Sequence, residues 1–413
     1  MRFLHLADLH LGKSIHGVSL LENGDQPCWV DRFLDLAAEV KPDAVLIAGD
    51  VYDRSAPSGD AVQLLSRMLT ALAERKIPVL LVAGNHDSAQ RLSFLGPILA
   101  QGGVHISRPL GESAELRHVT LEDAHGPVTF WLLPYVFPAL IAQSLGDESL
   151  RDNDTALRAL LARQPIDYTQ RNVLIAHQNV TAGGAEAPRG GSETMVGGVG
   201  QVDYTVFDGF DYVALGHIHA AYAVGRDTVR YAGSPLCYHF DETRQRAKGP
   251  VLVELGAKGE PVRTETRLIP PLHPMRELRG SYAELRDEML ADPRRGEYLR
   301  LVLTDCRVTP EIAAFFRDLT ESRESILMEL CSDYAAFAGE SAGAGGGAPE
   351  KGLAELFGDF YTERSGGIPP TDRDRELLAF AQRQTLQADA RSAPTEKETE
   401  ALLDYLLRQE GRR

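Results

Sequence analysis

The sequence predicts an α/β fold in which helices cover most of the sheet surface. Two observations support this prediction: short apolar runs of strand length recur along the chain, and segments with helical spacing of apolar residues alternate with them. This alternation is typical of α/β proteins. The expected strands are 2–7, 44–48, 79–83, 128–133, 172–176 and 212–215, and the expected helices are 29–40, 60–75 and 154–162.

Changes of composition predict four regions. The first domain is expected at 1–270, because a Pro-Pro pair ends it, and a small α+β domain is expected at 271–338. Residues 339–350 are mainly glycine and alanine, which predicts a flexible linker, and helices are expected at 351–413. The elements expected in the small domain are helices at 282–290 and 310–320 and strands at 298–304 and 326–330.

Composition limits the class of protein. The chain has 413 residues, of which 43% are hydrophobic, so a sizeable core is possible. Its net charge of −16 argues against broad electrostatic binding to nucleic acid, and a DNA substrate would need a local patch or a partner. No apolar run reaches the length of a membrane span, and the start lacks the pattern of a signal peptide. Four scattered cysteines without CxxC spacing indicate reduced thiols, so we expect a cytoplasmic protein without membrane contact.

Polar side chains follow five of the six predicted strands, at the point where each strand ends. Ligands bind at the carboxyl ends of strands in open α/β sheets, so we expect these groups to converge at one edge. Any one of these histidines is more often structural or solvated than a ligand. The ordered series DxH, GD, GNHD, H and GHxH is far less common by chance, and it predicts a metal centre. The seven candidate ligands are Asp8, His10, Asp50, Asn85, His177, His217 and His219.

The donor types indicate the metal and the chemistry. Imidazole nitrogens with carboxylate and amide oxygens suit Mn, Fe or Zn better than Ca. Seven ligands are too many for one ion and fit two ions that share a carboxylate. A pair of ions about 3.5–4 Å apart is the usual arrangement for hydrolysis of phosphoesters.

The motifs that contain these residues are HLADLHLGK, AGDVYDRSAP, AGNHDSAQRL, FDYVALGHIH and YAGSPLCYHFDE. In this order they resemble the calcineurin-like metallophosphoesterase superfamily, over roughly the first 270 residues. Within that superfamily they look like the nuclease subunits of bacterial ATP-dependent DNA end-processing complexes. The resemblance implies a two-sheet sandwich flanked by helices, with the metals at one edge, followed by a small capping domain and C-terminal helices.

The resemblance also implies a role for each polar residue. One metal would bind Asp8, His10 and His219, and the other would bind Asn85, His177 and His217. Asp50 would bridge the two. His86 would be catalytic, acting on the phosphate, while Asp87 would orient its neighbours or cap the following helix. Relatives outside bacteria carry a histidine at the position of Asp53, so no second catalytic imidazole is expected there.

The implied activity is two-metal hydrolysis of DNA phosphodiesters, most consistent with Mn²⁺. It would comprise double-strand 3'-5' exonuclease, single-strand endonuclease and hairpin cleavage in DNA repair, recombination and replication. The implied partners are DNA and a coiled-coil ATPase that binds the C-terminal helices, with a homodimer inside a heterotetramer. Two alternatives stay open: another calcineurin-like phosphodiesterase or phosphatase, and a scaffold whose metal site has decayed.

Three further segments have expected roles in this scheme. The small domain would steer DNA, with Arg294, Arg295 and Arg300 as candidate phosphate contacts. The Gly-rich loop at 181–201 would border the site. An apolar stripe at 353–361 would dock on the ATPase.

Overall fold

The computed structural model describes residues 1–184, 200–244, 248–333 and 371. The chain divides into two units, Met1–Ala338 and Gly339–Arg413. The predicted linker and the predicted C-terminal helices lie outside the described residues, apart from Thr371, as does most of the Gly-rich loop. The bounds of the four predicted regions stay predictions.

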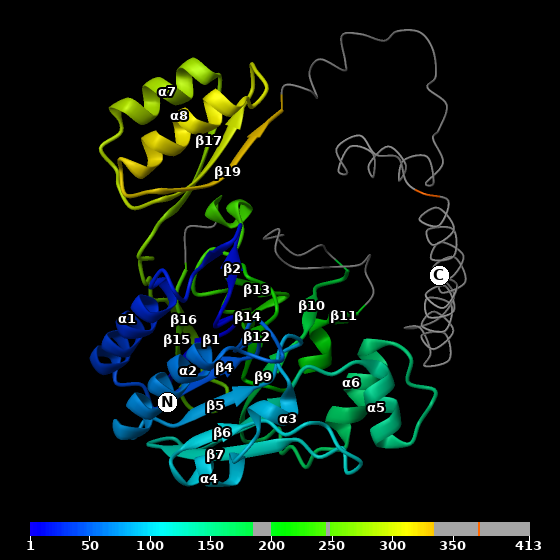
Figure 1. The fold of residues 1–413 in the computed structure, drawn as a ribbon. Helices are drawn as coiled ribbons and strands as arrows, with labels where there is room; N and C mark the ends of the chain where they lie inside the picture. The colour runs from blue at the N-terminus through cyan, green and yellow to red at the C-terminus, as the bar shows by residue number, and fades with distance from the viewer. Residues whose placement is uncertain (185–199, 245–247, 334–370, 372–413) are drawn as a thin grey trace, which may run out of the picture. The chain divides into compact units, whose positions relative to one another are not determined.

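Two six-stranded sheets form the centre of the first unit (Figure 1). The first sheet has the order β16 (Arg263–Thr266), β15 (Val251–Glu254), β1 (Arg2–Leu6), β4 (Ala44–Ala48), β5 (Val79–Val82), β6 (Val104–Ile106). The second has the order β13 (Tyr222–Val224), β14 (Arg226–Tyr231), β12 (Tyr212–Gly216), β9 (Arg171–His177), β8 (Gly126–Leu133), β7 (Arg117–Asp123).

The strands that lead to the candidate ligands run parallel within their own sheets. In the first sheet β1, β4, β5 and β6 are parallel, and β15 and β16 pair antiparallel beside β1. In the second sheet β8, β9, β12 and β14 are parallel, while β7 and β13 are antiparallel edges. Parallel strands end at the same edge, so the polar groups that follow them gather within each sheet.

The two sheets pack face to face around a shared apolar layer. Phe3 and Leu46 of the first sheet and Phe130 and Tyr212 of the second lie in one fully buried cluster. The ring of Phe3 meets the ring of Phe130 edge to face, with centroids 5.7 Å apart. Burying one such side chain stabilises the fold by about 1.5–3 kcal/mol. Alternate residues of each strand therefore fill the space between the sheets, as in other sandwiches.

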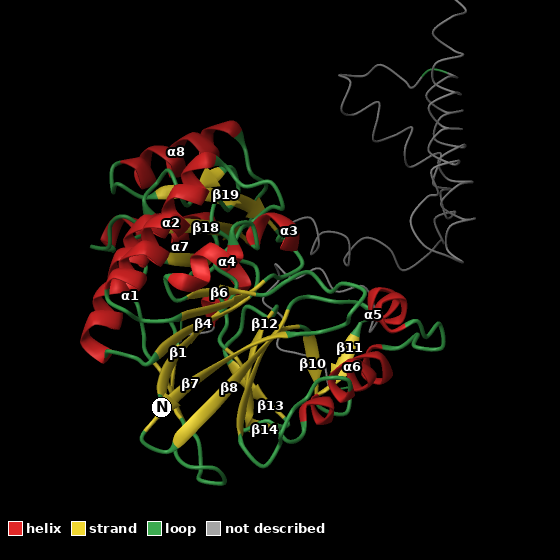
Figure 2. Cartoon of the chain, turned by 90° about the horizontal axis from the view of Figure 1, so that it is seen from below, coloured by secondary structure: helices red, strands yellow, loops and turns green. Residues whose placement is uncertain are grey.

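Helices cover the outer faces of the sandwich (Figure 2). Helices α1 (Asp25–Val40) and α2 (Gly59–Glu74) pack on the first sheet. Helices α5 (Pro138–Leu145) and α6 (Asn153–Ala162) pack on the second. Because both faces are covered, β4 and β9 are buried at every residue, and most of their residues are apolar. The predicted α/β sandwich with flanking helices is confirmed.

Residues 275–332 form a separate small sheet with two helices. Strands β17 (Met275–Gly280), β18 (Tyr298–Leu303) and β19 (Ile326–Ser332) are parallel, and α7 (Tyr282–Ala291) and α8 (Pro310–Glu321) pack on them around Phe316. The two helices and the two strands expected here are present. Strand β17 was not expected, because MRELRG is mostly polar.

Shorter elements complete the described part of the chain. None of its helices is long and apolar enough to cross a membrane. The remaining elements are β2 (Ser14–Ile15), β3 (Val18–Ser19), α3 (Ala89–Leu92), α4 (Gly96–Gln101), β10 (Asn179–Thr181), β11 (Gln201–Asp203), and the 3-10 turns η1 (Tyr204–Phe207) and η2 (Phe240–Arg244).

Candidate metal centre

All seven predicted ligands lie where a parallel strand ends. Asp8 and His10 follow β1, Asp50 follows β4, and Asn85 follows β5. From the second sheet, His177 ends β9, and His217 and His219 follow β12. The structure brings the groups from both sheets together, because the carboxyl ends of these strands meet at one edge of the sandwich.

Unusual backbone conformations aim several of these side chains into the site. Asp8, His10, Asp50 and His217 have positive φ angles of 54°, 41°, 47° and 108°. Each such conformation costs about 1–3 kcal/mol in a residue with a side chain, so the surrounding structure must hold it. Main-chain bonds do so: the amide of Asp8 donates to Gly49 O over 3.1 Å, and that of His10 to Asp50 O over 2.9 Å.

Two glycines allow the strand ends to approach closely. A Cβ added at Gly84 would lie 2.1 Å from Asp50 Oδ1, and one added at Gly216 would lie 1.9 Å from Ala48 O. Both distances are far below contact, so only glycine fits. The glycines of the GNHD and GHIH motifs therefore permit the convergence of the ligands.

The first cluster consists of Asp8, His10 and His219, whose ligand atoms all lie within 4.8 Å of one another. The Nε2 atoms of His10 and His219 are 3.2 Å apart. Nδ1 of His219 lies 3.2 Å from Glu242 Oε1, so that nitrogen carries the proton. Nε2 of His219 then presents a lone pair to His10. Two facing imidazole nitrogens can share one proton or bind one cation, and the buried carboxylate of Asp8 favours a cation.

The second cluster places several lone pairs around one point. Nδ1 of His177 donates to Ala48 O over 2.8 Å, which leaves Nε2 as an acceptor in the neutral ring. That Nε2 faces Asn85 Oδ1 at 3.0 Å and Asp50 Oδ2 at 3.4 Å. Nδ1 of His217 lies 3.1 Å from the same amide oxygen. His177 and Asp50 are buried, and acceptors that face one another in such surroundings need a proton or a metal ion between them.

The ionisation of His177 agrees with a cation at this point. Burial lowers its pKa, but Asp50 and Asp8 outweigh burial and raise the pKa to about 9. The isolated chain therefore holds a proton on His177 at neutral pH. A divalent ion can take the place of that proton and satisfy the same acceptors.

Asp50 lies between the two clusters. Its Oδ2 is 3.6 Å from His10 Nε2 and 3.4 Å from His177 Nε2, so one oxygen faces both sides. Its Oδ1 accepts the main-chain amide of His86 over 2.9 Å. Burial acts to raise the pKa of Asp50, yet the charge and hydrogen bond of His177 hold it well below the usual range. The carboxylate is ionised and available to two ions.

The pKa of Asp8 is shifted in the opposite direction from that of Asp50. Burial raises its pKa to about 7, although His177 and His219 act to lower it. Its two oxygens accept the main-chain amide of His217 over 3.0 and 3.3 Å. A cation in the first cluster would keep this buried carboxyl ionised.

His86 differs from the other histidines of the site because its side chain is 43% exposed. Its Nδ1 donates to Asp53 O over 2.9 Å, and its Nε2 lies 4.0 Å from Asp50 Oδ2. The ring also meets His10 edge to face. This position at the mouth of the site fits a group that meets the substrate. His86 can also be grouped with His10 and Asp50 as a ligand, so its role stays a prediction.

Asp87 holds the loops that carry the ligands. Its carboxylate accepts the main-chain amides of Val51, Tyr52 and Gly84 over 2.9–3.1 Å. The cap of α3 is Ser88 instead. Of the two roles expected for Asp87, the contacts fit the orienting one.

Sequence reasoning gave no role to Tyr238 and Glu242. The Tyr238 hydroxyl donates to Leu9 O over 2.7 Å and fixes the loop between Asp8 and His10. Both residues belong to the YAGSPLCYHFDE motif, which carries no predicted ligand. One feature of the sequence could have pointed to them. The motif resembles the superfamily although none of its residues is a predicted metal ligand, so its residues needed another role.

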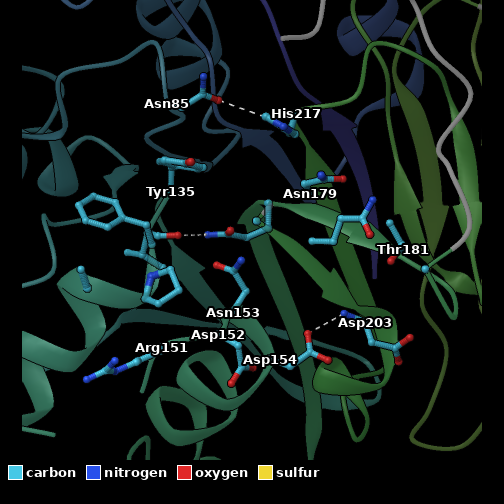
Figure 3. Close-up of a pocket in the computed structure, with 18 residues that line it drawn as sticks. Asn85, Tyr135, Arg151, Asp152, Asn153, Asp154, Asn179, Thr181, Asp203 and His217 are labelled. Carbon is cyan, nitrogen blue, oxygen red and sulfur yellow. Dashed lines mark hydrogen bonds between the residues drawn. The ribbon is translucent and has the colours of Figure 1, made fainter. Parts of the chain in front are cut away.

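A cavity of about 950 Å³ opens beside the second cluster. Figure 3 shows Asn85 and His217 at one end and Asp152 and Asp154 at the other. Tyr135 lies near the metal end, with its ring stacked on His217 at an interplanar angle of 21°. The site is therefore open to a substrate much larger than a phosphate ion.

Comparison with known proteins agrees with this geometry. Residues 1–221 match the family model described as Calcineurin-like phosphoesterase, which is more than half of the chain. The fold and the clustered donors thus place the chain in the class of calcineurin-like phosphoesterases.

Two curated relatives define the family more narrowly. The SbcD subunit of the nuclease SbcCD from Staphylococcus saprophyticus is 32% identical over 307 residues, which cover 73% of this chain and 78% of the relative. The protein of the same name from Staphylococcus epidermidis is 30% identical over 311 residues, or 74% and 79%. The chain belongs to this family of SbcD proteins. A crystal structure described as TT1561 of Thermus thermophilus aligns with 64% of this chain and 98% of its own, at 14% identity and a TM-score of 0.37, which is too loose to add support.

Proposed function

We propose that this chain is the nuclease subunit of an SbcCD-type DNA end-processing complex, and that it hydrolyses DNA phosphodiesters with two divalent metal ions. Family membership supports the substrate class. The observation that carries the proposal is the position of Asp50, whose Oδ2 faces both His10 and His177. One shared carboxylate between two donor clusters is what a two-ion phosphodiesterase requires.

The proposed ligand sets follow the two clusters. Asp8, His10 and His219 would hold the first ion, Asn85, His177 and His217 the second, and Asp50 both. When bound, two such ions polarise the phosphate and lower the pKa of a water molecule enough for attack at neutral pH. The donors are nitrogen and oxygen atoms without a thiolate, and we propose Mn²⁺ as the native ion.

His86 is proposed to act on the substrate. Its Nδ1–H is committed to the Asp53 carbonyl, so Nε2 is the nitrogen that faces the site. When the ring carries a proton on both nitrogens, Nε2–H can protonate the leaving oxygen or stabilise the charge that develops on the phosphate.

The small domain at 271–338 is proposed to guide DNA toward the metals. Its arginines differ in availability. Arg300 pairs with Glu277 and Glu329, at 3.2 and 3.0 Å, and Arg294 pairs with Asp292 at 2.8 Å. Arg295 donates to the Ser322 carbonyl. At Arg300 and Arg294, DNA phosphates would have to compete with these carboxylates. Arg295 is therefore the best candidate for a phosphate contact.

The proposed assembly is a homodimer within a heterotetramer. Helices α2, α3 and α4 present an apolar face with a hollow of about 770 Å³. On it Phe94 is 71% exposed and Ile98 is 62% exposed. A second copy of the chain would bury this face. The SbcC-type coiled-coil ATPase is proposed to bind the helices expected at 351–413, which lie outside the described residues.

A cytoplasmic location is proposed with the same function. All four cysteines are free thiols, which suits a reducing compartment. The proposed DNA substrate would be available in that compartment.

A direct test compares two kinds of substrate, DNA and a small phosphodiester, with the full-length chain and Mn²⁺. The proposal expects cleavage of a DNA hairpin and of a linear duplex end, with a chromogenic phosphodiester cut much more slowly. Preference for the small phosphodiester would favour another phosphodiesterase of the same superfamily. No hydrolysis of either substrate, with two Mn²⁺ ions bound, would favour the scaffold.

A further inference from the structure

We infer that Glu242 is a positioning residue for the first metal site: its carboxylate fixes the ring of His219 so that Nε2 points at the ion. The inference deepens the proposed two-metal function and rests on it. It predicts a selective effect, in which loss of Glu242 weakens the first ion and spares the second.

The contact between the two side chains defines the orientation of the ring. Oε1 of Glu242 lies 3.2 Å from Nδ1 of His219, and Glu242 is completely buried. A carboxylate paired with a cation can only accept a hydrogen bond, so the proton of the imidazole resides on Nδ1. Nε2 is thereby left as a lone pair that faces His10 and Asp8. A carboxylate behind a ligating histidine also makes that histidine a stronger ligand.

Hydrogen bonds from the described residues hold Glu242 itself. Its Oε2 accepts from Lys248 Nζ over 2.8 Å, from the amide of Tyr238 over 3.2 Å and from the hydroxyl of Ser234 over 3.3 Å. A buried carboxylate without such partners would cost several kcal/mol, so these contacts are needed to keep it in place. The position of Oε1 is therefore fixed before any metal binds.

Lys248 and Ser234 also hold the main chain of His219. Nζ of Lys248 donates to His219 O over 2.8 Å, and the amide of Ser234 donates to the same oxygen over 3.1 Å. Gly233, with φ of 74°, allows this approach, because an added Cβ would lie 2.8 Å from that oxygen. Residues of the segment that runs from Gly233 to Lys248 thus fix His219 at both its ring and its backbone.

This segment accounts for the motif that the metal ligands left unexplained. GSPLCYHFDE contains Gly233, Ser234, Tyr238 and Glu242, and none of them belongs to the ligand set. All four contact the first cluster or the chain that carries it. The motif is a support for one of the two ions.

The second site is supported differently, which makes the inference testable. Nδ1 of His177 is held by a main-chain carbonyl, that of Ala48. A change of the Glu242 side chain does not alter that bond. We therefore expect the two ions to respond differently to the same substitution.

The experiment measures Mn²⁺ binding by calorimetry in full-length variants, independently of nuclease activity. His177→Ala leaves the first site for measurement, and His10→Ala leaves the second. Glu242→Gln is placed in each background. Glu297→Gln is the matched control, since Glu297 is also a buried carboxylate but pairs with Arg276 in the small domain. Glu242→Asp replaces Glu242→Gln if circular dichroism shows that Glu242→Gln does not fold. The shorter side chain keeps the charge but withdraws it from Nδ1 of His219.

In the His177→Ala background, Glu242→Gln is expected to raise the Kd for Mn²⁺ by about 10–100-fold. In the His10→Ala background the Kd should stay the same, and Glu297→Gln should change neither. An unchanged Kd in the first background, or equal losses in both, would overturn the positioning role. A wild-type chain that binds fewer than two Mn²⁺ ions would instead refute the proposed metal centre.

Discussion

The two sides of the proposed metal centre orient their histidines by different means. His219 is held by the side chain of Glu242, whereas His177 is held by the main-chain carbonyl of Ala48 at the end of β4. A carbonyl at the end of a paired strand is present whatever side chain the residue carries. A carboxylate exists only because the sequence supplies it. The first site can therefore be tuned by substitution, while the second is set by the fold itself.

The two sides also differ in protonation. Burial lowers the pKa of His10 well below its usual value, so this ring is neutral. The pKa of His177 is about 9, because Asp50 and Asp8 outweigh burial. A metal ion must displace a proton from the second cluster but not from His10. Three experiments test this difference between the two sides.

The largest effect is expected for Asp50→Asn, because we propose that this residue serves both sides. Each ion contributes several kcal/mol of transition-state stabilisation, so we expect hydrolysis to fall by about 10⁴-fold or more. Mn²⁺ titration should show weaker binding of both ions. Loss of one ion with the other at full affinity would show that Asp50 belongs to one side alone. Asp60→Asn in the first turn of α2 is the control and should bind both ions.

A smaller effect is expected for His86→Gln, because His86 lies outside both proposed ligand sets. Hydrolysis should fall by about 10³-fold, within the range for loss of a general acid or charge stabiliser. Elemental analysis should still find two metals per chain. Loss of a metal in this variant would show that His86 is a ligand, and His86 would then join one of the two ligand sets. His125→Gln, in the exposed turn between β7 and β8, should change neither quantity.

The smallest effect is a difference in proton release. At pH 8, the second site should release close to one proton on binding Mn²⁺, because His177 is still protonated there. Its affinity should rise as the pH is raised toward about 9 and fall as the pH is lowered, since protons and metal compete. The first site should release almost none at pH 8, since the pKa of Asp8 is about 7. Calorimetry in two buffers of different ionisation enthalpy measures the release from the second site in His10→Ala and the release from both sites together in the wild-type chain, in which His177 still acts to lower the pKa of Asp8. The release from the first site is the difference between the two. Equal release from the two sites would contradict the assigned protonation states.

Much of the site could be predicted from sequence because its geometry follows from strand ends. A fully buried strand such as β4 is a continuous apolar run, so the polar residue after it stands out. Glycines mark the close approach of two strand ends, at Gly84 and Gly216. Parallel pairing then places Asp8 and Asp50 at one edge of the first sheet and His177 at an edge of the second, whereas the meeting of these two edges depends on how the sheets pack.

The support of His219 could not be predicted in the same way. Glu242 lies 23 residues along the chain from His219, in a 3-10 turn with no periodic pattern. Its role depends on how a loop folds back over the site. The edge strands were missed for a related reason. Strand β7 is exposed at alternate residues, and β16 and β17 are largely polar, so none of them reads as an apolar run.

The central claim is that two ions share Asp50, and electron paramagnetic resonance of bound Mn²⁺ tests it most directly. The wild-type chain loaded with two Mn²⁺ ions should give the spectrum of an exchange-coupled pair, because ions that share one carboxylate lie about 3.5–4 Å apart. Asp50→Asn loaded in the same way should lose that coupling. Two uncoupled Mn²⁺ signals in the wild-type chain, or saturation at one ion per chain, would contradict the account.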